Sequence, residues 1–102
     1  MTPQRNVEKR LKQVRDELAR TREALRIIDE QIAYQRDVAH DAATRAAVSA
    51  TPLADRQRRE AAQDLRRLER QHDETAARVA ELLEEQDELL ERLLPGPGRA
   101  RA

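Results

Sequence analysis

The sequence predicts an all-α protein that folds as a two-helix antiparallel coiled-coil hairpin. Three observations predict this fold class. Apolar residues recur in alternating steps of four and three along two long segments, helix-breaking residues occur only between these segments and after the second, and the segments carry complementary charge. Such a chain buries its apolar side chains along one narrow interface between its own helices.

The composition fits a narrow apolar interface better than a thick core. Hydrophobic residues make up 38% of the 102 residues and charged residues 39%, with one tyrosine and no phenylalanine or tryptophan. Twenty bases balance twenty acids, which argues against disorder and against a general nucleic-acid-binding protein. The lack of cysteine, of an apolar signal core and of a membrane-length apolar run predicts a cytoplasmic protein without a membrane partner.

The first helix is predicted over about residues 5–47. Its apolar residues follow a heptad pattern in which Thr21 and Gln35 are the only polar members. The small residues near its end predict close approach of the two helices. The predicted a positions are Leu11, Leu18, Leu25, Ile32, Ala39 and Ala46, and the d positions are Val7, Val14, Thr21, Ile28, Gln35 and Ala42.

A loop at residues 48–51 is predicted to lead into a second helix over about residues 52–94. Thr51 suits the N-cap, because its hydroxyl can accept a hydrogen bond from a free backbone amide of the first turn. Pro52 suits the first helical position, and Asp55 suits the positive end of the helix dipole. These signals place the start of the second helix at residue 52.

The second helix is predicted to end at the PGPG sequence of residues 95–98. Residues 1–94 are then one helical domain, and residues 95–102 are a flexible tail. The predicted interface positions of this helix are Ala54, Arg58, Ala61, Leu65, Leu68, His72, Thr75, Val79, Leu82, Gln86, Leu89 and Leu93.

Charge supports the antiparallel arrangement independently of the apolar pattern. Residues 5–26 contain eight bases and four acids, a net charge of +4, whereas residues 73–94 contain eight acids and two bases, a net charge of −6. A short loop between two long helices brings these two ends together only if the helices run in opposite directions. The charge pattern therefore favours the hairpin over a parallel homodimer.

The two histidines are the candidates for metal or acid–base chemistry. His72 falls on the predicted interface near Gln35, and the pair predicts a polar layer that fixes the helix register. His40 stands beside Asp37 and Asp41, where a solvated polar surface is a better interpretation than a metal site. Without a Ser/His/Asp set, a Gly-rich loop or a nucleotide fingerprint, we expect no enzymatic activity, no metal and no cofactor.

Apolar residues outside the interface predict a binding surface. A hairpin that hides only its own interface leaves them in water, and such rows commonly contact another protein or a second copy in a four-helix bundle. Tyr34 is the predicted anchor, because interface energy concentrates in aromatic side chains. The predicted function is therefore that of a non-catalytic regulatory or adaptor protein. The predicted partner-binding residues are Ala24, Ile27, Tyr34, Val38, Leu83, Leu90 and Leu94.

The segment DEQIAYQRDVAHDAAT at residues 29–44 resembles the motif helix of RsiG-type anti-sigma factors of actinobacteria. The signature of that family, E-x3-S-x2-R-x3-Q-x3-D, falls here with its arginine at Arg36 and His40 at its glutamine position. The same spacing in the second helix retains Glu60, Arg67 and Gln71. The resemblance implies an antiparallel coiled coil that regulates transcription by binding a sigma factor and cyclic di-GMP.

Under this alternative, the nucleotide site comprises Arg36, His40, Arg67 and Gln71. The planar guanidinium groups of the two arginines would stack on guanine or pair with phosphate. Both segments lack the serine and the final aspartate of the signature, which predicts weak or absent nucleotide binding. Three functions thus stay open. The first is an adaptor that binds a protein or itself, and the second is an anti-sigma factor that sequesters a sigma factor with or without cyclic di-GMP. The third is a purely structural spacer, which predicts a monomer without a binding partner.

Overall fold

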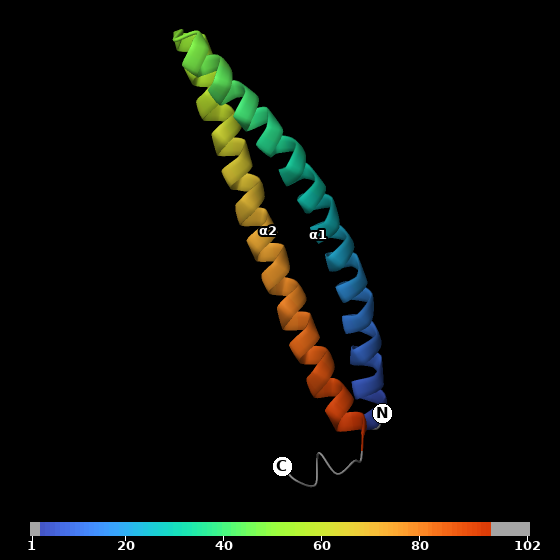
Figure 1. Ribbon diagram of the computed structural model, residues 1–102. Coiled ribbons are helices and arrows are strands. Elements are labelled where there is room, and N and C mark those ends of the chain that lie inside the picture. Colours follow the sequence, from blue (N-terminus) through green and yellow to red (C-terminus); the bar gives the residue numbers. More distant parts are fainter. Residues whose placement is uncertain (1–2, 95–102) are drawn as a thin grey trace. The chain divides into compact units, whose positions relative to one another are not determined.

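The computed structural model describes residues 3–94 and shows an antiparallel helical hairpin (Figure 1). Helix α1 comprises Pro3–Val48 and helix α2 comprises Pro52–Leu93, and no strand occurs within the described residues. The predicted fold class is confirmed. α1 begins two residues earlier and ends one residue later than expected, whereas α2 begins at the expected proline. The predicted tail, residues 95–102, lies outside the described residues.

The start of α2 has the capping geometry that the sequence predicted. The Thr51 hydroxyl accepts a hydrogen bond from the backbone amide of Ala54 at 3.1 Å. The Asp55 carboxylate accepts hydrogen bonds from the side chains of Arg58 and Arg59. The hydrogen bond from Arg58 lowers the pKa of Asp55, so this carboxylate stays ionised beside the positive end of the helix.

The chain divides into two compact units, and each contains an antiparallel stretch of α1 and α2. Within the described chain, the terminal unit comprises residues 3–23 and 76–94, and the turn unit comprises residues 24–75. The domain predicted over residues 1–94 thus contains two units. In the terminal unit, large aliphatic side chains from both helices form the core, and Val7, Leu11, Val79 and Leu83 pack against it. The buried members of this core are Val14, Leu18, Leu82 and Leu89.

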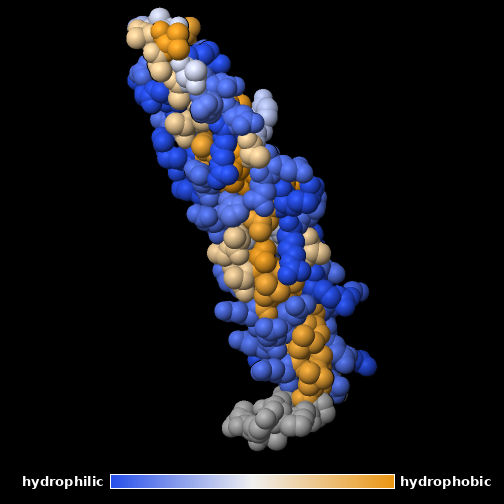
Figure 2. Space-filling model, viewed as in Figure 1, coloured by the Kyte–Doolittle hydropathy of each residue, from blue (hydrophilic) through white to orange (hydrophobic). Residues whose placement is uncertain are grey.

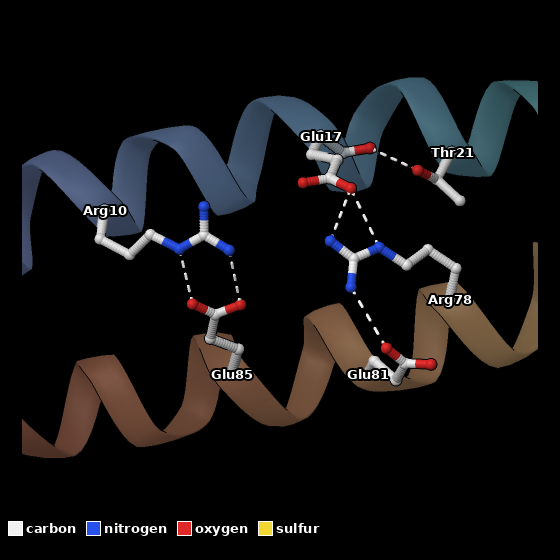
Figure 3. A network of polar contacts seen from close by, with 6 residues as sticks. All are labelled: Arg10, Glu17, Thr21, Arg78, Glu81 and Glu85. Carbon is white, nitrogen blue, oxygen red and sulfur yellow. Dashed lines mark hydrogen bonds and ion pairs between the residues drawn. The ribbon is translucent and has the colours of Figure 1, made fainter.

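Two ion pairs join the helices of the terminal unit (Figure 3). The Arg10 guanidinium donates two hydrogen bonds to Glu85, at 2.6 and 2.8 Å, and the Arg78 guanidinium donates to Glu17 at 2.7 and 3.0 Å. The hydrogen bond from Arg10 lowers the pKa of Glu85. The first pair has the base on α1, as the charge pattern predicted, and the second has it on α2. Because the two pairs have opposite polarity, sliding one helix along the other would bring like charges together. The two pairs therefore favour the observed register.

The turn unit buries smaller side chains than the terminal unit does. Ile28 and Ile32 lie in its interface at one end, and nearer the turn the buried residues are Ala42, Ala54 and Ala61. Alanine lets the two backbones approach closely, but it removes less apolar surface from water than leucine or isoleucine does. The helices of this unit therefore gain less from apolar burial per turn.

The predicted polar layer of His72 and Gln35 is wrong. Gln35 Nε2 donates to the backbone carbonyl of Ala61 at 3.1 Å, whereas His72 Nε2 lies 3.2 Å from Asp29. The methyl side chain of Ala61 leaves its carbonyl accessible to the long glutamine side chain, so the amide pairs with backbone rather than with imidazole. Arg58 also departs from prediction, because it is exposed and pairs with Asp55 instead of lying in the interface.

Candidate partner-binding surface

The seven residues predicted to bind a partner are divided between the two units, and each group is described by itself. The turn unit contributes four residues of α1, and the terminal unit contributes two leucines of α2 and Leu94, which directly follows α2. Figure 2 shows hydrophobic residues in narrow patches bordered by hydrophilic ones. The members in the turn unit are Ala24, Ile27, Tyr34 and Val38, and those in the terminal unit are Leu83, Leu90 and Leu94.

The surface of the turn unit is centred on Tyr34, whose side chain is 72% exposed. Ile27 precedes it by seven residues, two helical turns away on the same face, and is 43% exposed. Ala24 is also exposed, whereas Val38 is half-buried. Most of Tyr34 is thus in contact with water, although an aromatic side chain is costly to leave there.

Two open grooves meet at Tyr34 and Gln35, and together we call them the Tyr34 groove. The first is largely apolar and runs between α1 and Leu68 of α2. The second has an alanine floor and a charged rim contributed by both helices. The first is lined by Ile27, Glu30, Gln31, Tyr34, Gln35 and Leu68, and the second by Tyr34, Gln35, Val38, Ala42, Arg45, Gln57, Glu60, Ala61 and Asp64.

The rim of the Tyr34 groove carries net negative charge. Two of its acids are neutralised on their own helices, Glu30 by Arg26 at 2.6 Å and Asp64 by Arg67 at 3.2 Å. Helical spacing places two further acids beside Tyr34, at i+3 and i+7. The same spacing places one further base, Arg56, at i−4 from Glu60. Three acids and two bases of this set have no ion pair within residues 3–94, which gives a local charge of −1. Glu60 and Arg45 line the groove, and Asp37, Asp41 and Arg56 flank it.

The leucines of the terminal unit make a smaller surface. Leu83 packs against the buried core of that unit, so much of its side chain is used within the hairpin. Leu90 and Leu94 are 40% and 61% exposed. We therefore place the main candidate surface in the turn unit.

Sequence reasoning missed two exposed apolar residues at the turn, Val48 and Leu53. They lie in an uncharged run, residues 46–54, in a chain that is 39% charged. The lack of charge in this run was the signal for an apolar surface at the turn, because surface segments of such a chain are otherwise rich in charge. They add to the exposed apolar residues of the turn unit.

One of the four residues of the predicted nucleotide site lies in a depression that the other three do not line. Arg36 lines a depression of the turn unit, but Arg67 is exposed and pairs with Asp64, and His40 and Gln71 are exposed. Three carboxylates line the Arg36 depression and oppose the approach of a phosphate group. The residues lining it are Asp29, Ile32, Arg36, Glu69, His72 and Asp73.

Within residues 3–94, no group of three or more His, Cys, Asp or Glu side chains could hold a metal ion. Neither α1 nor α2, as described, includes a stretch with the length and apolarity needed to cross a membrane. Comparisons with models of protein families, with curated proteins and with solved structures gave no match.

Proposed function

We propose that the protein is a non-catalytic coiled-coil adaptor or regulator that binds another protein through the Tyr34 groove. The exposure of Tyr34 beside an apolar groove is the observation that carries this proposal. Aromatic side chains contribute a large share of the energy of many interfaces, because they bury much area at a low entropic cost. We place this activity in the cytoplasm.

The role of each residue follows from its position. Tyr34 and Ile27 are the anchors, since they are the two large apolar side chains of the groove that remain exposed. Leu68 and Val38 contribute apolar lining from α2 and α1 respectively. Because α1 and α2 both line the groove, pairing of the helices shapes the surface before the partner arrives.

The test is the double substitution of Ile27 and Tyr34 by glutamate. Wild type and variant are used as bait in a lysate of the source organism, and retained proteins are quantified by mass spectrometry. We expect a defined protein to bind wild type and to be lost from the variant. Burying the two added carboxylates in an apolar interface is unfavourable unless each pairs with an opposite charge. Light scattering on each bait shows whether the retained partner is instead a second copy.

A matched control carries the same two added charges elsewhere on α1. Ala19 and Ala33 are exposed and do not line the Tyr34 groove, so their replacement by glutamate should leave binding unchanged. Equal retention of the partner by wild type and by the Ile27/Tyr34 variant would disprove the proposal. Equal loss in both variants would mean that charge, rather than the groove, controls binding.

An anti-sigma function is a particular case of protein binding, and a sigma factor would then be the retained protein. Control by cyclic di-GMP has less support, because carboxylates from both helices line the depression of Arg36. We expect calorimetric titration with cyclic di-GMP to give no heat. A heat of binding that disappears on replacing Arg36 and Arg67 by alanine would restore nucleotide control.

A further inference from the structure

Helix α1 has two neighbouring heptad rows within the turn unit, and only one of them is packed. The first row includes Ile28 and Ile32, which are buried between the helices. The second row advances by three, four, three and four residues, and most of it is exposed. Its members are Ala24, Ile27, Gln31, Tyr34 and Val38. A row with this spacing matches the side chains of another α-helix, whose apolar residues recur with the same period.

The dimensions of the Tyr34 groove also suit a helix. Its lining residues on α1 extend from Ile27 to Arg45, and at 1.5 Å per residue these 18 steps correspond to about 27 Å. A helix of about 18 residues has this length. The small side chains of Ala42 and Ala61 on the groove floor leave space for larger side chains of an incoming helix.

The charge of the rim determines what kind of helix fits best. Asp37, Asp41 and Glu60 have no ion pair within the described part of the chain, and two bases of the rim, Arg45 and Arg56, are in the same condition. The rim therefore keeps a net charge of −1. A helix with lysine or arginine beside its apolar row would place bases against these carboxylates. A second copy bound through the same surface would bring two rims of net negative charge together, which opposes self-association.

Resting on the function proposed above, we infer that the occupant of the Tyr34 groove is a basic amphipathic helix of another protein. Its apolar row packs on Ile27 and Tyr34, and its lysine or arginine side chains pair with Asp37 and Glu60. This mode of recognition combines apolar burial for affinity with charge for orientation and for choice of partner.

Two synthetic peptides of about 18 residues, long enough to span the groove, test this inference by fluorescence anisotropy. Both have leucine at heptad a and d positions, and the remaining positions are mainly lysine in one peptide and glutamate in the other. We expect the lysine peptide to bind, and to bind at least about tenfold more tightly than the glutamate peptide. The Tyr34→Glu variant should lose the lysine peptide.

Charge variants separate the groove from the charge of the whole protein. Asp37→Lys with Glu60→Lys should weaken binding of the lysine peptide by at least about tenfold, because it reverses the charge of the rim. Asp16→Lys with Glu88→Lys makes the same change of net charge at exposed positions of the terminal unit. This control should bind the lysine peptide as wild type does.

The possible failures are distinguishable. Tighter, Tyr34-dependent binding of the glutamate peptide would overturn the basic helix and leave the groove as the binding surface. A dimer of the protein that Tyr34→Glu dissociates would make a second copy the occupant and would also overturn the inference. Absence of lysine-peptide binding, or equal binding of this peptide by wild type and Tyr34→Glu, would contradict the basic-helix inference. In that case, loss of a cellular partner from the Ile27/Tyr34 variant would still support the proposed function as a protein-binding adaptor.

Discussion

The terminal unit and the turn unit are built from the same two helices, but they bury different side chains. The terminal unit encloses Val14, Leu18, Leu82 and Leu89 and is bridged by two ion pairs between the helices. In the turn unit, alanines replace the large residues toward the turn. The helices of this unit are linked by a hydrogen bond from Gln35 to backbone and by the contact of His72 with Asp29. The first arrangement removes more apolar surface from water.

The exposed side chains show the opposite distribution. Among residues 3–94, six large hydrophobic residues are exposed, and four of them lie in the turn unit, namely Ile27, Tyr34, Val48 and Leu53. A unit that buries less within the hairpin thus retains more apolar surface for another molecule. We conclude that the terminal unit contributes most to holding the hairpin closed, whereas the turn unit provides the surface for binding.

The largest effect on stability is expected from Leu82→Ala in the terminal unit. Leu82 is fully buried, so truncation removes transfer energy and leaves a cavity, with an expected loss of about 2–5 kcal/mol in the free energy of unfolding. Urea denaturation followed by circular dichroism measures this loss. Leu53→Ala at the exposed turn is the matched control and should cost less than about 1 kcal/mol. Similar losses in both variants would contradict the division of roles between the units.

A smaller effect is expected from Ala61→Leu in the turn unit. Ala61 is buried beside Ala42 at the bottom of the groove, and a larger side chain there forces the helices apart at a cost of about 1–3 kcal/mol. Ala33→Leu makes the same change at an exposed position of α1 and should be nearly neutral. If Ala61→Leu stabilises the protein instead, the turn unit is loosely packed and its groove is not preformed.

The ion pairs of the terminal unit predict a dependence of stability on acid. Because Arg10 lowers the pKa of Glu85, the pair stabilises the fold above the ordinary glutamate pKa, about 4.3, and this contribution is lost as the pH falls through the lowered value. Glu85→Gln should therefore lower the melting temperature at pH 7 and converge with wild type in acid.

Glu84→Gln is the control for this titration, because Glu84 is exposed on the same turn of α2. It should change the melting temperature less than Glu85→Gln does at pH 7. Parallel behaviour of the two variants from neutral to acid pH would show that the hydrogen bonds from Arg10 to Glu85 add nothing in solution.

The fold followed from the sequence because its determinants are periodic. The heptad rows identified Val14, Leu18 and Leu82 as interface residues, and the N-cap at Thr51 placed the start of α2. Partners of individual polar side chains were harder to predict. The hydrogen bond from Gln35 to a backbone carbonyl depends on how far one helix is shifted along the other. A pattern of residue types does not specify that shift.

The candidate surface was predictable only in part for the same reason. Helical spacing alone identified Tyr34 and Ile27 as exposed neighbours. Leu68 lines the groove from the other helix, although the heptad pattern assigned it to the interface. The pattern also grouped Leu90 with Tyr34, whereas these residues belong to different units. Features within one helix were thus predictable, and features shared between helices required the structure.

The smallest effect on stability is expected from Tyr34→Ala. Because most of this side chain is in water, the free energy of unfolding should change by no more than about 0.5 kcal/mol. Affinity for the partner should nevertheless fall by about 2 kcal/mol or more, as at an interface anchor. Denaturation and binding measured on the same preparation separate the two quantities. A Tyr34→Ala variant that unfolds more easily but still binds its partner would show that Tyr34 stabilises the hairpin rather than binding the partner. That result would contradict the division into a stabilising terminal unit and a binding turn unit.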